Sequence, residues 1–370
     1  MFKSVSAFVF VFVLIVSANA QIQKTTHNRT LVDEDYEYTE TAGRQRDLKT
    51  QLEKGLAFYR AGDFRAAANA FAEATALDPS GFTAYHNLGA THLRLNDFKA
   101  AVDDLKKAVE LEPDSATAWH FLGFAFYHLK QNEEAVKCYE RAVELDQRSI
   151  VTWNNLGETY LELEKFDSAG DAFKKALALE PKSVDSMSGL CVSYARQKQS
   201  QEALATCAEV RAKKPSFSTT YYQAWSYLDL QKFPEAISLL QECLLLDPSA
   251  SATYTALAEA YYRTKRFNEA LGYAQKAAQL SPDSQTAYVA LGAIYFEMKK
   301  LKDARRFFEK AVSIEPQSAS TRYNLALTCL AMKQKDCARE QYAILKTSEP
   351  VLSTRLLDMI YSSKVIQLVK

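Results

Sequence analysis

The sequence predicts an all-α fold, a right-handed superhelical α-solenoid made of tandem helix-turn-helix repeats. Two observations predict it. Prolines recur every 34 residues or a multiple of 34, with a single spacing of 33, at positions 79, 113, 181, 215, 248, 282, 316 and 350. Small residues such as glycine and alanine, and large aromatic residues, also recur at fixed places between these prolines. A fixed period of about 20–50 residues indicates a repeat architecture in which neighbouring units share a continuous core.

Each repeat is numbered here so that its proline is position 32, and two helical stripes then become visible. Positions 4, 7, 8 and 11 are spaced i, i+3, i+4 and i+7, so they lie on one face of a first helix. Positions 20, 24 and 27 form a similar stripe on a second helix. Position 20 is alanine in all nine repeats: Ala67, Ala101, Ala135, Ala169, Ala203, Ala236, Ala270, Ala304 and Ala338. Stacked repeats of this kind create a concave inner surface.

This pattern closely resembles the tetratricopeptide repeat family, and the resemblance covers residues 48–350. It is carried by small residues at position 8, such as Gly123 and Gly157, by the alanines at position 20, and by aromatic residues such as Trp119 at position 4. The resemblance implies nine repeats whose first helices line a groove that binds a protein or peptide partner.

The N-terminal residues 1–20 have the features of a secretory signal peptide. Lys3 supplies a positive charge, Ala7–Val16 is an apolar run, and Ala18–Ala20 provides small residues for cleavage before Gln21. The apolar run is too short to span about 30 Å of hydrocarbon. We therefore expect an exported protein, periplasmic or secreted, that has no membrane span after cleavage.

Two further segments flank the repeats. Residues 21–47 are polar, with an acidic stretch from Asp33 to Glu40, and are expected to form a disordered linker. Residues 351–370 follow the last proline position. Within them, Leu352–Tyr361 is amphipathic and predicts a capping helix, and the rest predicts a tail.

The composition excludes several functions. The chain has 45 basic and 45 acidic residues, so it lacks the positive excess that a nucleic-acid partner requires. It contains no glycine-rich phosphate loop, nucleophile elbow or zinc-helix motif. His86 and His120 share position 5 of adjacent repeats, but equivalent positions on packed helices are about 8–10 Å apart, too far to converge on one metal ion. We expect neither a cofactor nor an enzymatic activity.

The six cysteines suggest two disulfides. In a helical hairpin that turns near position 15, facing positions sum to about 30. Cys329 and Cys337 occupy positions 11 and 19 and should face each other, whereas Cys191 and Cys207 occupy positions 8 and 24, about half a turn out of register. Disulfides persist outside the cytosol. The alternative is that all six cysteines are small buried hydrophobic residues.

A second stripe on each first helix, at positions 2, 5, 6, 9, 12 and 13, should line the groove. It predicts these contact residues: His86, Asn87, His120, Phe121, Phe124, Asn155, Glu158, Tyr221, Tyr222, Trp225 and Asn324. Positions 5, 9 and 12 also pack neighbouring helices, so Phe124, Tyr127 and Trp225 have ordinary core packing as an alternative. Position 6 should be more open, which favours Phe121 and Tyr222 as contact residues. Exposed aromatic residues in a groove suit a peptide or, alternatively, a glycan.

The predicted function is therefore a non-enzymatic interaction scaffold. The residues around Asn87 and Asn155 do not match the lysine, arginine and asparagine pattern with which chaperone-binding members of the family hold a terminal carboxylate. One alternative is a regulatory or substrate-binding subunit of an envelope enzyme or polysaccharide machinery. Such a subunit would resemble the repeat region of O-N-acetylglucosaminyl transferases without their catalytic domain.

Overall fold

The computed structural model describes residues 31–361 and consists of nine helix pairs followed by one further helix. The first helices of the pairs are α1 (Leu31–Ala61), α3 (Phe82–Arg94), α5 (Ala116–His128), α7 (Ile150–Glu162), α9 (Val184–Arg196), α11 (Phe217–Asp229), α13 (Ser251–Arg263), α15 (Gln285–Glu297) and α17 (Ala319–Ala331). The second helices are α2 (Phe64–Leu77), α4 (Phe98–Leu111), α6 (Asn132–Leu145), α8 (Phe166–Leu179), α10 (Ser200–Lys213), α12 (Phe233–Leu246), α14 (Phe267–Leu280), α16 (Leu301–Ile314) and α18 (Lys335–Ser348). The predicted all-α repeat fold is confirmed.

The turn inside each pair has the same backbone conformation in every repeat. Position 15 is left-handed throughout, from Gly62 with φ 82° and Asn96 with φ 59° to Lys333 with φ 62°. Glycine and asparagine tolerate this region best, yet lysine, glutamate or glutamine occupies it in the later repeats. Packing of the two helices therefore imposes this conformation even where the residue at position 15 does not favour it.

Close approach of the two helices depends on a small residue at position 8 facing a large one at position 24. A Cβ atom placed on Gly123 would lie 2.9 Å from the ring of Tyr139, and one on Gly157 would lie 2.7 Å from Phe173. These distances are shorter than van der Waals contact. Glycine at position 8 thus allows the aromatic ring on the second helix to lie against the backbone of the first.

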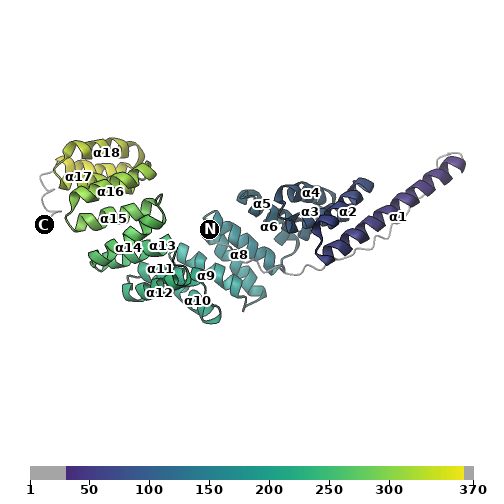
Figure 1. Ribbon diagram of the computed structural model, residues 1–370, viewed down its shortest axis with the longest axis horizontal. Helices are drawn as coiled ribbons and strands as arrows, with labels where there is room; N and C mark the ends of the chain where they lie inside the picture. Colours follow the sequence, from purple (N-terminus) through teal and green to yellow (C-terminus); the bar gives the residue numbers. More distant parts are fainter. Residues whose placement is uncertain (1–30, 362–370) are drawn as a thin grey trace.

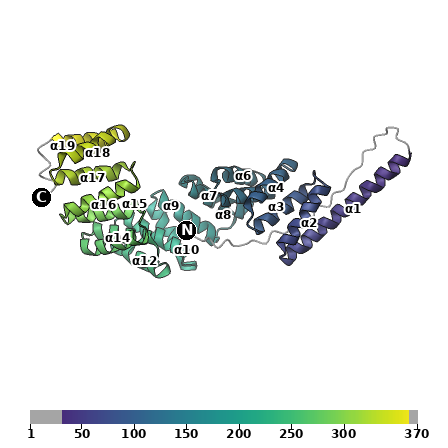
Figure 2. The same cartoon turned by 45° about the horizontal axis from the view of Figure 1, so that its top comes forward.

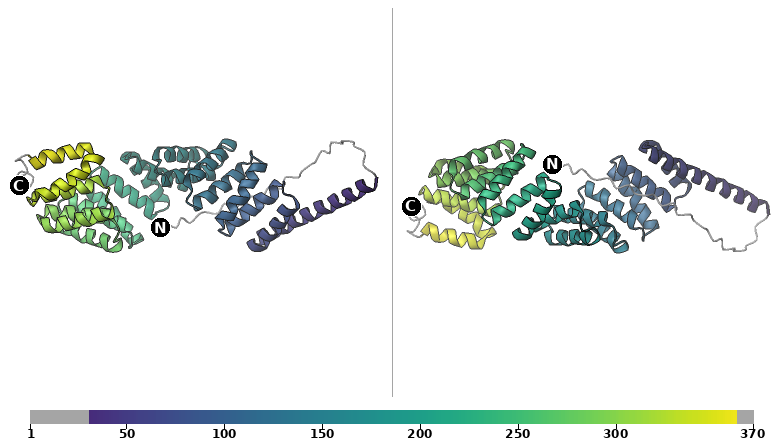
Figure 3. Two further views of the ribbon diagram at one scale, coloured as in Figure 1. Left: turned by 90° about the horizontal axis from the view of Figure 1, so that it is seen from above. Right: turned by 90° about the horizontal axis from the view of Figure 1, so that it is seen from below.

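The array is elongated and curved (Figures 1 and 3). Consecutive first helices contact one another from α3 through to α17, whereas consecutive second helices make no comparable contact within residues 31–361. In a curved stack, the helices on the concave side are the ones that come close together. The first helices therefore line the groove, as the sequence predicts.

The N-terminal end differs from the expected disordered linker. Residues 31–47 are helical and form the first half of α1, which extends away from the rest of the array (Figure 2). The physical reason is continuity: no proline interrupts residues 31–61, and the second half of α1 is held by packing against α2, so the helix can propagate backwards from it. The predicted signal peptide, linker residues 21–30 and tail residues 362–370 lie outside the described residues.

The C-terminal end is closed by α19 (Pro350–Tyr361). It packs against α17 and α18 and buries Leu356 and Ile360 in the last apolar cluster. Within residues 31–361, no helix is both long enough and apolar enough to cross a membrane.

Candidate protein-binding groove

The groove face begins with stacked rings on α3 and α5. His86 lies between Phe82 and Phe121, with ring centroids 5.1 Å and 5.4 Å away. Nδ1 of His120 lies 2.9 Å from the hydroxyl of Thr152 on α7. Burial lowers the pKa of both histidines to about 4, so both rings are neutral at physiological pH. Because Phe121 stacks on His86, most of its ring is in contact with the neighbouring repeat.

The three predicted asparagines at position 6 do not behave alike. Asn87 is only 5% exposed, and its Nδ2 atom is buried and has no hydrogen-bond partner among the described residues. Asn155 is half-buried, as is Asn324 near the end of the array. The expectation that position 6 is the more open one is wrong for Asn87, because its helix α3 is packed against α2, α4 and α5.

Acidic side chains occupy the middle of the face. Glu158 and Glu162 lie on α7, and Asp185 lies at the start of α9; all three are exposed. Glu158 faces solvent but is flanked by protein, and this partial loss of hydration raises the pKa of its carboxyl, with repulsion from Asp185 and Glu162 adding to the effect. On α5, burial and the same two glutamates raise the pKa of Tyr127 to about 12.

A second aromatic group lies on α11. Tyr222 and Trp225 stack at 6.0 Å, and Tyr221 meets both rings edge-on. Trp225 is 41% exposed, whereas Tyr221 and Tyr222 are half-buried. Core packing, the alternative considered for Trp225, therefore does not hold: it is an open side chain at position 9. Phe124 is half-buried against the ring of His128, 4.4 Å away, and so belongs mainly to the packing of its own repeat.

Arg196 links this aromatic group to the preceding repeats, and sequence reasoning missed it. Its guanidinium lies 4.5 Å from the Phe166 ring and 5.9 Å from the Trp225 ring, and it pairs with Glu164 at 3.2 Å. Its place at position 13, between aromatic residues of two neighbouring repeats, is the signal that could have identified it.

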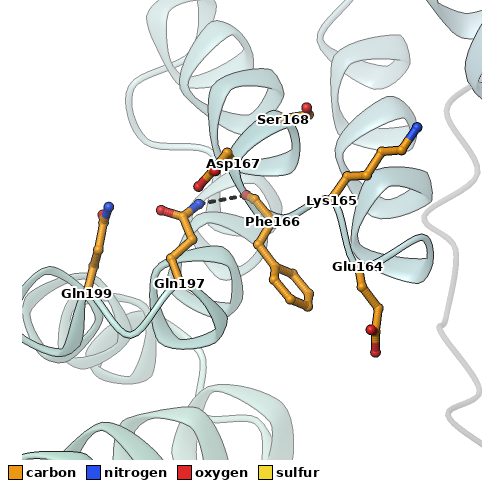
Figure 4. A pocket seen from close by; sticks show the side chains of 7 residues that line it. All are labelled: Glu164, Lys165, Phe166, Asp167, Ser168, Gln197 and Gln199. Carbon is orange, nitrogen blue, oxygen red and sulfur yellow. Dashed lines mark hydrogen bonds between the residues drawn. The ribbon is translucent and has the colours of Figure 1, made fainter. Parts of the chain in front are cut away.

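Two hollows lie beside Arg196. The larger, about 490 Å³, lies where the turns of repeats four and five meet, and Gln197 donates a 2.6 Å hydrogen bond from Nε2 to the carbonyl of Phe166 there (Figure 4). The smaller, about 280 Å³, is lined by Arg196, Trp225 and Asp229 among others. Both are open to solvent. In the described part of the chain, no group of three metal-ligating side chains could hold an ion.

The cysteines form two disulfides within single repeats. Cys329 is joined to Cys337, with Cα atoms 5.9 Å apart, and Cys191 is joined to Cys207, with Cα atoms 5.1 Å apart. The second pair shows that positions 8 and 24 face each other, as Gly123 and Tyr139 also do. Cys138 and Cys243 are buried free thiols, and burial raises the pKa of each to about 12.

Family models described as tetratricopeptide repeat match consecutive, partly overlapping segments of the chain. The matched residues are 52–102, 82–125, 114–182, 160–224, 220–250 and 249–317. The search of curated proteins finds no match.

Solved structures support the same fold. A chain of the APC/C hetero-tetramer Cut9–Hcn1 is 17% identical with a TM-score of 0.55, over 75% of this chain and 55% of that one. A tetratricopeptide repeat protein from Parabacteroides merdae is 16% identical with a TM-score of 0.50, over 67% of this chain and 99% of that one. At these identities the similarity concerns the fold alone.

Proposed function

Since this chain belongs to the tetratricopeptide repeat family, whose members are interaction scaffolds, we propose that it binds a segment of a partner protein in its concave groove and catalyses no reaction. The proposal rests chiefly on the open aromatic group of α11. Tyr221, Tyr222 and Trp225 form one contiguous surface beside the guanidinium of Arg196. Tryptophan, tyrosine and arginine are the residue types that carry most binding energy at protein interfaces.

The chemistry of the remaining groups supports a non-catalytic role. A nucleophilic cysteine requires a depressed pKa, but burial raises the pKa of the Cys138 and Cys243 thiols to about 12, so both stay protonated at neutral pH. A general base must be exposed to a substrate, yet His86 and His120 are held within the packing of repeats two to four.

Export remains part of the proposal. The disulfides Cys191–Cys207 and Cys329–Cys337 are of a kind that persists in the periplasm or outside the cell and is rare in the cytosol. They support the expectation that residues 1–20 direct the chain out of the cytosol.

The test is in-cell crosslinking and pull-down with the full chain. We expect Tyr222→Ala/Trp225→Ala to lose the protein that the wild type captures, because it removes the open aromatic surface. The control is Leu245→Ala on α12, which removes an 85% exposed apolar side chain from a second helix, outside the groove. Circular dichroism establishes that each variant is folded. Equal capture by all three proteins would refute a role for the groove.

A further inference from the structure

We infer that the partner segment is positively charged, with lysine or arginine side chains placed between apolar or aromatic ones. This inference rests on the proposed function and deepens it, because it concerns the same groove. It is drawn from three features of repeats three to eight: unpaired carboxylates, their arrangement across neighbouring helices, and the open aromatic group beside them.

The carboxylates at the centre of the groove have no cationic partner. Within residues 31–361, no lysine or arginine forms an ion pair with Glu158, Glu162 or Asp185. Other acidic side chains nearby do form ion pairs: Glu164 with Arg196 at 3.2 Å, and Glu259 with Arg263 at 3.3 Å. Carboxylates placed together without a counter-charge repel one another, and a cation supplied from outside relieves that repulsion.

These groups come from three consecutive first helices. Tyr127 projects from α5, Glu158 and Glu162 from α7, and Asp185 from α9. The negative charges of Glu158 and Glu162 both raise the pKa of Tyr127 in the preceding repeat. Glu158 is also repelled by Asp185 in the following repeat. The acidic surface therefore runs across the repeats, along the direction in which an extended segment would lie.

The excess of negative charge continues along the face. At positions 2, 5, 6, 9, 12 and 13 of repeats four to eight there are two cations, Arg196 and Arg263, and both are already paired. The same positions carry six carboxylates: Glu158, Glu162, Asp185, Asp229, Glu259 and Glu297. The whole chain is neutral, so this local excess is a property of the groove. A concave surface of one sign attracts a partner of the opposite sign and speeds its association.

The aromatic residues define the rest of the occupant. Tyr222 and Trp225 follow the acidic surface on the next first helix, and Tyr127 precedes it. A segment lying across α5, α7, α9 and α11 would thus meet aromatic, acidic and again aromatic surface. Apolar side chains suit the outer sites, and cationic ones suit the middle, where they gain both ion pairs and contacts with aromatic rings. Nucleic acid is disfavoured because its phosphates would be repelled.

The test selects random short peptides displayed on phage against the full, disulfide-intact chain. Selection is repeated against Glu158→Gln/Glu162→Gln/Asp185→Asn, which neutralises the central carboxylates, and against Tyr222→Ala/Trp225→Ala. The matched control, Asp103→Asn/Glu133→Gln/Glu202→Gln, removes three exposed carboxylates from the second helices α4, α6 and α10.

We expect the wild type and the matched control to enrich peptides rich in lysine or arginine. These peptides should bind the charge-neutralised variant on the order of tenfold more weakly, and more weakly in high salt. Enrichment of neutral or acidic peptides that still require Tyr222 and Trp225 would overturn the charge inference and leave groove binding intact. Peptides that bind all four proteins equally, or no enrichment at all, would contradict both.

Discussion

His86 illustrates how a single side chain on the groove face is held by packing. It is stacked between Phe82 and Phe121, and its Nδ1 atom is buried without a hydrogen-bond partner among the described residues. Burial disfavours the charged ring and lowers its pKa from 6.5 to about 4. The unfolded chain therefore binds more protons than the folded chain between these values, and stability is lost as the pH falls from 6.5 towards 4.

We predict that His86→Phe stabilises the protein. Phenylalanine keeps the ring stack and removes a buried unpaired nitrogen, so the free energy of unfolding at pH 7 should rise by about 1 kcal/mol. Its loss between pH 6.5 and 4 should become shallower. Urea denaturation of the variant and of the wild type at several pH values measures both effects. A lower stability at pH 7 with an unchanged pH dependence would contradict this account.

At the scale of the helix pair, repeat five departs from its neighbours. Most other repeats place a large side chain at position 24 against a small residue at position 8, as Tyr139 does against Gly123. Repeat five places the disulfide Cys191–Cys207 there, and both cysteines are fully buried. The other buried residues of α9 and α10 include Ser186, Ser193 and Ser200. The covalent bond thus occupies the place of the apolar contact that holds the other pairs together.

Reduction should therefore loosen α9 and α10 in particular. A dithiol reductant that converts Cys191–Cys207 to two thiols should cost about 3 kcal/mol of stability, the scale for a loop of this length. In Cys191→Gly/Cys207→Phe, which restores the glycine–aromatic pair, hydrogen exchange in α9 and α10 should respond far less to reductant. Cys329→Ala/Cys337→Ala should remain as sensitive there as the wild type. Equal sensitivity of the wild type and the glycine–phenylalanine variant would refute this role.

The whole molecule is a stack in which each repeat contacts its neighbours, so stability is distributed along it. The buried apolar residues form several successive clusters rather than one centre. The last cluster ends in α19, where Leu356 and Ile360 are buried. In such a quasi-one-dimensional array, a defect at one end should spread only to the adjacent repeats.

We predict that Leu356→Ala acts locally. Loss of a fully buried leucine costs about 2–5 kcal/mol, and the cost should appear as faster hydrogen exchange in α17, α18 and α19. Exchange in α3 to α8 should match the wild type. Val351→Ala, at a 65% exposed residue of the same helix, should change neither region. Faster exchange throughout the array would show instead that the repeats unfold as a single unit.

The sequence by itself determined the repeat, because helix periodicity and helix-pair packing are local. The two helical stripes, the left-handed turn at Gly62 and Asn96, and the facing of Cys329 and Cys337 all depend on residues within one repeat. These features can be read from spacing alone. The disulfide Cys191–Cys207 is confirmed, although the simple rule that facing positions sum to about 30 places its two cysteines half a turn out of register.

Tertiary structure alone decided which residues of the groove face are open. That outcome depends on the angle and distance between successive repeats, which no single repeat encodes. Packing of α3 against α2, α4 and α5 buries Asn87, and stacking against His86 covers part of Phe121. By contrast, Trp225 remains 41% exposed beside Ala195 and Arg196 of repeat five. The same stacking brings Glu158 towards Asp185, and so turns carboxylates scattered along the sequence into one acidic surface.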